Sequence, residues 1–433
     1  MPNIHNLTYL DLFAGAGGLS EGFIRSGFKP IAHVESDIAA CYTLKTRLAY
    51  WWLRKQGELC TYEKYIRGIL NREEFYKLIP SDVLNRVINI EISDDNIEKI
   101  FKEIDAKKGR KKISLIIGGP PCQAYSVAGR ARNKEKAEKD SRNYLYQYYA
   151  KFIERYAPEY FVFENVVGML TAKNGENDTY FDKMKKLFES IGYSVEYKIL
   201  NAKDYGVLQN RRRIILIGRK GKNHVNFYPS LPSITLNHHV KEIFTDLPAI
   251  CAGEGKPTPV ETLDYRGEYL FESKIKARNK EFVTFHYSRK NCDRDLEIYR
   301  TAVKMWNDEG KRLNYPDLKD CLKTHTNTSV FIDRFKVVSD NQQFSQTIVA
   351  HISKDGHYYI HPDIAQNRSI TPREAARLQS FPDSYYFESV SGNPSMASAF
   401  KQIGNAVPVR MAECIAIAMK MLLKKPTQKN HKD

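Results

Sequence analysis

The sequence lacks the features that would mark a secreted, membrane-bound or metal-binding protein. Its seven cysteines are an odd number, and no two of them form a Cys-x-x-Cys pair. A disulfide framework and a structural zinc site are therefore not expected. The first residues contain no apolar run of the signal-peptide type, and no apolar stretch approaches the ~20 residues of a membrane span. These absences predict a soluble, cytoplasmic protein without membrane contact.

Acidic residues are few relative to basic ones. The chain has 51 Asp and Glu against 67 Lys and Arg, which leaves a net charge of +16. This excess points to a polyanionic partner, and nucleic acid is the first candidate, although a basic chain of no special purpose is equally open. His351, His357 and His361 have no carboxylate or cysteine that completes a metal set, so no metal is expected.

Apolar segments alternate with segments of helical spacing along the first half of the chain. A helix is expected over 145–156, where apolar residues recur at 145, 148, 149, 152, 153 and 156. Strands that alternate with helices favour an α/β fold with a doubly wound, mostly parallel sheet. The expected strands lie at 7–13, 30–36, 113–119, 160–165 and 212–219.

Changes of texture along the 433 residues predict the domains. Residues 1–222 carry the strand and helix units, with a charged insertion at about 45–112. For the basic run KKGRKK at 107–112, which ends the insertion, a solvated face is favoured and DNA contact stays open. Residues 223–395 are irregular, polar and aromatic, and they predict a smaller second domain. Within it, residues 345–362 are typical of a hairpin that turns at Asp355-Gly356. Residues 396–433 form a C-terminal segment with an amphipathic helix.

A glycine-rich turn follows the first expected strand. Gly15, Gly17 and Gly18 let backbone amides approach a ligand at the start of a helix. Glu35 ends the second strand, where a carboxylate can accept the ribose hydroxyls of a nucleotide-type cofactor. Packing alone can require such a turn, and NAD is an alternative. However, the spacing is not G-x-G-x-x-G, and Asp11 suits a ligand that carries an ammonium group.

Cys122 lies in an unusual loop, GGPPCQAYSVAGR, after the strand at 113–119. Pro120 and Pro121 fix two φ angles before it, a rigidity that a cysteine kept for packing does not need. A thiolate is a strong nucleophile, and this loop opens at the carboxyl edge of the sheet, where ligands bind. Glu164 ends the next strand at the same edge, either as a cap or as a carboxyl that protonates a substrate ring nitrogen.

Eight short blocks along the chain carry a family signature. They are DLFAGAGGLSEGF at 11–23, ESD at 35–37, GGPPCQAYS at 118–126, DSRNYL at 140–145, ENV at 164–166, QNRRRIILIG at 209–218, RSITPREAARLQSFPDSY at 368–385 and QIGNAVP at 402–408. In this order they resemble the DNA cytosine-5 methyltransferases of bacterial restriction-modification systems. The resemblance implies a large S-adenosyl-L-methionine-binding domain, a small target-recognition domain and a C-terminal helix that returns to the large domain.

The resemblance also implies a role for individual residues. Cys122 would add to carbon-6 of a cytosine flipped out of duplex DNA, Glu164 would act at ring nitrogen-3, and Arg211 would bind the base oxygen. Phe13 would stack on the cofactor adenine, with Glu91-Ile92 near its amino group. The implied catalytic set is Cys122, Glu164, Arg211 and Arg213. The implied cofactor set is Asp11, Phe13, Ala14, Gly15, Gly17, Gly18, Leu19, Glu35, Ser36, Pro120, Asn405 and Ala406. The implied DNA-binding loop contains Gln123, Ser126, Arg130, Arg132 and Arg142.

Two other functions stay open. An RNA cytosine-5 methyltransferase would use the same chemistry, although the basic insertion and the large variable region favour DNA. A catalytically silent DNA-binding module is disfavoured by the intact catalytic set. We expect a monomer that acts on double-stranded DNA, with a possible cognate restriction endonuclease that needs no direct contact. Residues 223–395 should read the DNA word, with candidate readers at 271–295.

Overall fold

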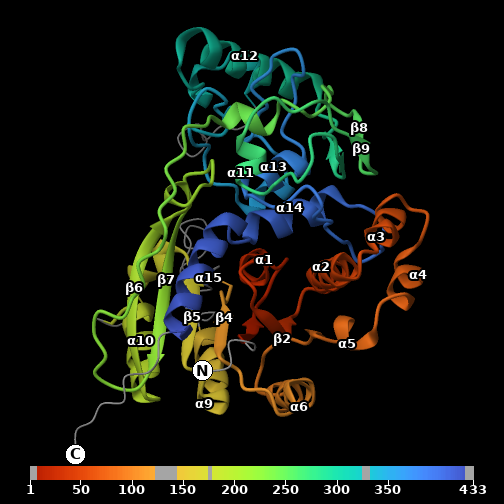
Figure 1. Ribbon diagram of the computed structural model, residues 1–433. Coiled ribbons are helices and arrows are strands. Elements are labelled where there is room, and N and C mark those ends of the chain that lie inside the picture. Colours follow the sequence, from red (N-terminus) through yellow and green to blue (C-terminus); the bar gives the residue numbers. More distant parts are fainter. Residues whose placement is uncertain (1–6, 122–143, 174–177, 324–331, 425–433) are drawn as a thin grey trace, which may run out of the picture.

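One central sheet organises the first half of the chain (Figure 1). The computed structural model describes residues 7–121, 144–173, 178–323 and 332–424. The strands of the sheet are β1 (Thr8–Leu12), β2 (Lys29–Glu35), β3 (Val87–Asn89), β4 (Leu115–Gly118), β5 (Tyr160–Asn165), β6 (Tyr193–Asn201) and β7 (Arg212–Lys220). Their order is β3-β2-β1-β4-β5-β7-β6, and within this sheet β7 alone runs against the other strands. The expected mostly parallel, doubly wound sheet is confirmed.

Helices cover both faces of the sheet. They are α1 (Gly18–Arg25), α2 (Ile38–Gln56), α6 (Ile97–Lys108), α9 (Leu145–Tyr156), α10 (Tyr180–Ser190) and α15 (Val409–Lys424). Because strand side chains alternate, Leu10 and Leu12 join the core under α6, α9 and α10, while Tyr9 joins the core under α1 and α15. Both faces are therefore apolar, as a parallel sheet requires, and the helix expected over 145–156 is confirmed as α9.

The last described helix packs tightly on the first. A Cβ atom at Gly22 of α1 would lie 2.4 Å from the backbone N of Glu413 in α15, and one at Gly18 would lie 2.4 Å from the carbonyl O of Val407. Only glycine fits at these two contacts. Lys420 also donates from Nζ to the carbonyl O of Ser26 at 2.7 Å. Helix α15 therefore lies beside α1 on one face of the central sheet.

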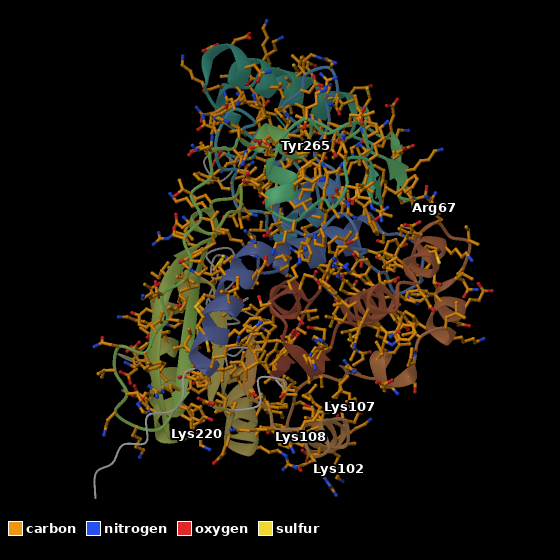
Figure 2. The ribbon with its side chains drawn as sticks, in the orientation of Figure 1. Arg67, Lys102, Lys107, Lys108, Lys220 and Tyr265 are labelled. Carbon is orange, nitrogen blue, oxygen red and sulfur yellow. The ribbon has the colours of Figure 1, made fainter. Side chains whose placement is uncertain are left out.

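Residues 45–112 are not uniform in structure. Their middle contains α3 (Leu59–Ile66), α4 (Arg72–Lys77) and α5 (Ser81–Leu84), which lie beside the sheet, whereas β3 and α6 belong to the sheet layers. Arg67, which follows α3 and is labelled in Figure 2, contacts residues 223–405, here called the second region. Its guanidinium lies 3.9 Å from the centre of the Phe282 ring. The segment α3–α5 thus connects the two regions of the molecule.

Glu388 is the buried centre of this connection. Its Oε1 accepts hydrogen bonds from Thr46 of α2 and Tyr65 of α3, both at 2.5 Å, and Arg72 of α4 lies 3.7 Å from its Oε2. Burial raises the pKa of the Glu388 carboxyl to about 7, because the neighbouring donors only partly offset the lost hydration. A neutral carboxyl therefore fits this position better than a charged one.

The second region stands above the carboxyl ends of the strands in Figure 1. Apart from α12, its regular elements are short: β8 (Gly255–Lys256), β9 (Val260–Glu261), α11 (Tyr269–Glu272), β10 (Phe282–Val283), β11 (His286–Tyr287), α12 (Asp293–Glu309), α13 (Pro372–Leu378) and α14 (Met396–Asn405). The two small sheets pair β10 with β9 and β11 with β8. Irregular backbone fills most of the remaining chain, in keeping with the change of texture in the sequence.

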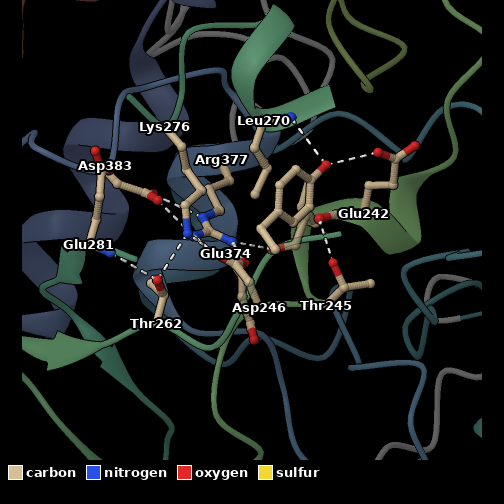
Figure 3. Close-up of polar contacts among 12 residues, drawn as sticks. Glu242, Thr245, Asp246, Thr262, Leu270, Lys276, Glu281, Glu374, Arg377 and Asp383 are labelled. Atoms are coloured by element: carbon tan, nitrogen blue, oxygen red, sulfur yellow. Dashed lines mark hydrogen bonds and ion pairs between the residues drawn. The ribbon is translucent and has the colours of Figure 1, made fainter. Parts of the chain in front are cut away.

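Buried ion pairs hold the second region together (Figure 3). Arg377 donates to Asp246 at 2.5 Å and to Asp383 at 2.6 Å, and Lys276 bonds the other oxygen of Asp246. Burial opposes charge on Asp246, but the guanidinium of Arg377 and the ammonium of Lys276 hold its pKa below the ordinary value. Removing one partner of such a network leaves a buried charge, which is strongly destabilising.

The hairpin predicted at residues 345–362 is wrong. The segment instead forms a 3-10 helix at Ala350–Ser353, and Ile360 bridges Val337 and Ser369. Gly356 does adopt a positive φ of 78° at the expected turn. The alternating pattern failed because the backbones of its two halves pair elsewhere, Ser345 with Gln209 and Ile360 with Val337 and Ser369, while the halves touch each other through side chains.

Candidate active site

The carboxyl ends of four parallel strands meet at one edge of the sheet. Leu12 of β1 pairs with Val34 of β2 and Gly118 of β4, and Gly118 pairs with Phe163 of β5. We call this the carboxyl edge. The residues one step further along these strands are Phe13, Glu35, Gly119 and Glu164, and the register sets them side by side.

Glu164 and Arg213 form an ion pair at the carboxyl edge. Arg213 Nε lies 2.8 Å from Glu164 Oε1, and the side chains are 13% and 14% exposed. The pair forms because β7 runs antiparallel beside β5, so that β7 begins where β5 ends. A guanidinium beside a carboxyl can bind a planar ring that carries a nitrogen next to a carbonyl oxygen.

The loop that leads to Cys122 starts from a close approach of backbones. A Cβ atom at Gly118 would lie 2.3 Å from the carbonyl O of Leu12, and one at Gly119 would lie 2.5 Å from Glu164 Oε2. A side chain at position 118 would therefore clash with backbone, whereas one at position 119 would displace the Glu164 carboxylate. The expected nucleophile and loop residues lie outside the described residues: Cys122, Gln123, Ser126, Arg130, Arg132 and Arg142.

Arg211 lies two residues before Arg213 but in a different environment. Its side chain is 1% exposed, and its guanidinium donates to the carbonyl O atoms of Ile348 at 2.6 Å, Gly404 at 3.1 Å and Ala406 at 3.0 Å. The expected contact of Arg211 with a base oxygen is therefore corrected, because this guanidinium is engaged in the interior. Arg211 joins three segments of the chain, and Arg213 is the arginine at the carboxyl edge.

Glu35 is arranged as an acceptor at the end of β2. Its Oε2 accepts the N–H of Gly15 at 2.7 Å, and its Oε1 accepts those of Ser36 at 2.9 Å and Asp37 at 2.8 Å. Burial raises the pKa of Glu35, and these three N–H groups oppose the rise. A carboxylate has about four acceptor sites. Glu35 can therefore accept at least one hydroxyl of a ribose without losing its place.

The turn beside Glu35 leaves room for a ligand. Gly15 and Phe13 have positive φ values of 54° and 56°, and a Cβ atom at Gly15 would meet nothing within 4 Å. Positive φ is uncommon for a phenylalanine and is typical of functional sites. The half-buried Phe13 ring, the open turn and the Glu35 carboxylate fit the adenosine part of a nucleotide-type cofactor.

Asp11 is not at this opening. Its side chain is 1% exposed, and its Oδ2 lies 3.2 Å from Nδ1 of the equally buried His33. Burial raises the pKa of Asp11, and His33 opposes that rise. The expected contact of Asp11 with a ligand ammonium group is therefore corrected to a buried pair beneath the turn.

The remaining residues of the glycine turn pack against the protein. Gly17 has a φ of 81°, and a Cβ atom there would lie 2.7 Å from the Leu44 side chain. Gly18 faces α15, and Leu19 is 6% exposed in the core. On the Cβ side these three residues therefore pack within the protein, and the expected approach of their backbone amides to a cofactor stays a prediction. Packing, the alternative that the sequence left open for this turn, accounts for the close contacts of Gly17 and Gly18.

The last members of the expected cofactor set border the turn. Ala14 is buried and donates its N–H to Val34 at 3.2 Å, whereas Ser36 is exposed beside Glu35. Ala406 lies with its Cβ 3.0 Å from a Cβ atom placed at Gly18, and Asn405 is exposed at the end of α14. Ser36 and Asn405 are thus open to a ligand, whereas Ala14 and Ala406 are buried and pack within the protein.

Two residues with clear positioning contacts received no individual role from the sequence. Gln209 is fully buried; its Nε2 donates to Leu378 O and its Oε1 accepts the N–H of Ile348, both at 2.9 Å. Asn165 donates from Nδ2 to Pro120 O at 3.4 Å, which ties the start of the Cys122 loop to β5. Both residues belong to sequence blocks typical of the family, Gln-x-Arg-x-Arg and Glu-Asn-Val. Their individual roles could not be predicted, because their hydrogen-bond partners are far away in the sequence.

Within the described ranges, no group of three or more His, Cys, Asp or Glu side chains could hold a metal ion. The histidines at 357 and 361 are instead buried: Tyr299 OH lies 2.8 Å from His357 Nδ1, and His361 lies 3.9 Å from Glu374. Among the same residues, no helix is long and apolar enough to cross a bilayer.

Comparison with known proteins identifies the family. The family model of C-5 cytosine-specific DNA methylases matches residues 7–56 and 83–421. The chain belongs to this family. The model omits 57–82, the stretch that contains α3 and α4 and begins α5. The internal segment that the family model does not match, 57–82, is therefore shorter than the insertion predicted at about 45–112.

Curated relatives support the same family over nearly the whole chain. The sequence is 39% identical over 447 residues to the type II methyltransferase M.Bpa9945I of Bacillus paralicheniformis, with 95% of this chain and 98% of the relative covered. It is 30% identical over 426 residues to the type II methyltransferase M.DdeI of Desulfomicrobium norvegicum, with 95% and 88% covered.

Solved structures share the fold of this methylase. A crystal structure from E. coli, of a prophage-encoded protein named as a candidate DNA modification methyltransferase, is 24% identical with a TM-score of 0.60 and covers 96% of this chain and 99% of that one. The Entamoeba histolytica methyltransferase EhMeth is 14% identical with a TM-score of 0.52, with 96% and 98% covered. These likenesses confirm the methyltransferase type of α/β fold.

Proposed function

We propose that the chain methylates carbon-5 of a cytosine in double-stranded DNA, with S-adenosyl-L-methionine as the methyl donor. The observation that carries the proposal is the Glu164–Arg213 pair, joined at 2.8 Å at the edge from which the Pro-Pro-Cys loop leaves the sheet. Membership of the cytosine-specific family supports the same reaction. The similarity to type II methyltransferases favours a modification enzyme of a restriction-modification system.

The chemistry follows from the weak nucleophilicity of cytosine carbon-5. The Cys122 thiolate forms a bond to carbon-6, and the electrons of the 5,6 double bond shift toward ring nitrogen-3, where Glu164 holds a proton. Arg213 binds the neighbouring base oxygen, where negative charge grows. Carbon-5 is now part of an enamine and would form a bond to the donor's methyl carbon as the methyl–sulfur bond breaks, with S-adenosyl-L-homocysteine as the leaving group. Loss of the carbon-5 proton then restores the double bond and expels the thiolate.

The donor would be held at the glycine turn. Phe13 would stack on the adenine, Glu35 would accept from the ribose, and Ser36 and Asn405 would border the site. When bound, S-adenosyl-L-methionine supplies an electrophilic methyl group. The open space at Gly15 and the acceptor geometry of Glu35 support this placement.

The substrate cytosine must leave the duplex, because carbon-6 is not accessible within stacked bases. In this proposal residues 1–222 bind the cofactor and the flipped base, 223–395 recognise the DNA word, and 396–433 return to the catalytic domain. The loop residues Gln123, Ser126, Arg130, Arg132 and Arg142 would contact the DNA. The enzyme works in the cytoplasm as a monomer, and a cognate endonuclease needs no contact with it.

Covalent trapping tests the reaction. Duplex DNA that carries 5-fluorocytosine should form a stable adduct, since fluorine cannot leave as a proton does, and Cys122→Ser should form none. Tritium transfer from labelled donor to duplex DNA and to transfer RNA separates the alternatives. Transfer to RNA alone would favour an RNA enzyme, and DNA binding without any transfer would indicate a silent module. Near-parent methylation by Cys122→Ser would overturn the mechanism.

A further inference from the structure

A polar groove lies just beyond the carboxyl edge of the sheet. It is lined by residues 341–347 together with Asn210, His239 and Arg312, and we call the segment 345–347 its floor. Asn210 is three residues before Arg213, so about 10 Å of extended chain separates the groove from the Glu164 pair. We call this the reading groove. Its position lets one DNA duplex reach both the groove and the site of base flipping.

The floor of the reading groove is fixed to the catalytic domain. Asn210 donates its N–H to Ser345 O at 2.9 Å, and Ser345 donates its own to Leu208 O at 3.0 Å. Thr347 Oγ1 donates to Asn210 O at 2.6 Å, and Gln346 Nε2 donates to Tyr358 O at 2.7 Å. The backbone that carries the groove side chains is therefore held in register with the strand that carries Arg213.

The side chains at the mouth of the groove are not engaged in this way. Asn341, Gln342, Gln343 and Arg312 are exposed, and within the described part of the chain their side chains form no hydrogen bond or ion pair. Amide side chains match the N6 and N7 edge of adenine in the major groove, and arginine matches guanine or phosphate. Three adjacent amides on a fixed floor are thus suited to base edges.

Two of the basic residues at 271–295, the stretch that the sequence offered as readers, are engaged within the protein. Lys276 is buried in its ion pair with Asp246. Arg289 donates to the carbonyl O atoms of Ile352 at 2.5 Å and Lys354 at 3.1 Å. Two of the basic side chains in that stretch thus stabilise the protein interior, so they are poor candidates for base contacts.

We propose that Gln342 and Gln343 read at least one A·T pair of the DNA word beside the flipped cytosine, and that Arg312 holds a phosphate at the rim. The inference rests on the proposed methylation of DNA and adds the residues that set its specificity. It adds the segment joined to Asn210 to the candidate readers in residues 271–295, of which Lys276 and Arg289 are engaged within the protein.

The test maps methylated words by bisulfite sequencing of a random duplex library. Parent enzyme should mark a word that contains an A·T pair. The double variant Gln342→Ala/Gln343→Ala should lose about 5- to 150-fold of the preference at that pair while it keeps methylating carbon-5. Arg312→Gln should weaken binding to all words alike and lower the log–log salt slope by about 0.9. Gln56→Ala, an exposed glutamine at the end of α2, is the matched control.

The outcomes separate the two proposals. A parent enzyme that marks no cytosine contradicts the proposed function. A parent word without an A·T pair, or a folded double variant that keeps the full parental preference, contradicts the reading groove while the proposed function stands. Thermal unfolding of each variant, expected within the range of the control, shows whether lost activity reflects misfolding.

Discussion

The carboxyl edge and the reading groove differ in how their side chains are placed. At the edge, strand register sets Glu164 beside Arg213, and glycine at position 119 leaves room for the carboxylate. In the groove, irregular backbone is fixed through Ser345 and Thr347, while the amides of Gln342 and Gln343 stay exposed. Fixed geometry suits chemistry on one base, whereas exposed side chains on a fixed floor can change without loss of the fold.

The largest effect should follow from a change at the carboxyl edge. Glu164→Gln keeps the shape of the side chain but cannot supply a proton, so methyl transfer should slow by ~10²–10⁴-fold. Single-turnover kinetics measure the rate, and calorimetry measures donor affinity, which should stay near the parent value. Glu154→Gln, an exposed carboxylate of α9, is the control. A variant that loses donor affinity but keeps its rate would show that Glu164 serves the cofactor.

Substitutions of Arg211, just before β7, and of Arg213, within β7, should affect different properties: the first should lower stability and the second should lower catalysis. Arg211→Met leaves three buried carbonyl oxygens without their donor, so the free energy of unfolding should fall by about 3 kcal/mol or more. Arg213→Met should cost activity with little change in stability, because its side chain is partly exposed. Urea denaturation and methyl-transfer rates of both variants check this. Equal loss of stability in the two variants would contradict the division of roles.

The sequence predicted those features of the two regions that depend on residues close together in the chain, and it missed those that depend on residues far apart. The five strands expected in the sheet, the glycine turn and the positions of Glu35 and Glu164 follow from local patterns and are found where the patterns indicated, whereas β3 and β6 were not predicted. The burial of Arg211 could not be foreseen, because its acceptors at Ile348 and Gly404 are more than a hundred residues away. The mistaken hairpin near Gly356 has the same cause, since alternation indicates a strand but not its partner.

The joint between the two regions should respond to pH. The pKa of Glu388 rises from 4.5 to about 7 on folding, so the folded state holds its proton more tightly than the unfolded state. Its contribution is therefore complete below about pH 4.5, is lost as pH rises through 7, and amounts to at most about 3 kcal/mol.

The variant Glu388→Gln isolates this effect. It can still accept from Thr46 and Tyr65 but does not titrate. The difference in unfolding free energy between parent and variant should shift in favour of the variant between pH 5 and pH 8. Urea denaturation across that range measures the difference. A difference that is constant with pH would mean that Glu388 is already charged in the folded protein.

The smallest effect is expected at the end of the sheet farthest from the reading groove. Residues 107–112 are strongly basic, and they precede β4, whose first residue pairs with Tyr9 near the start of β1. Figure 2 shows Lys107 and Lys108 on the side of the molecule opposite the second region. DNA that occupies the reading groove and the carboxyl edge should not reach this surface, so its charge should face solvent.

Arg110, Lys111 and Lys112 are exposed, and within the described residues their side chains form no hydrogen bond or ion pair, so the triple glutamine variant should fold normally. Three phosphate contacts would contribute about 2.7 to the log–log salt slope of binding, at roughly 0.9 each. We expect the triple variant to change that slope by less than about 0.9, which is less than the single change Arg312→Gln. Binding titrations between low and moderate salt measure both slopes, and a loss near 2.7 in the triple variant would place DNA on this surface as well and remove the contrast between the two ends of the sheet.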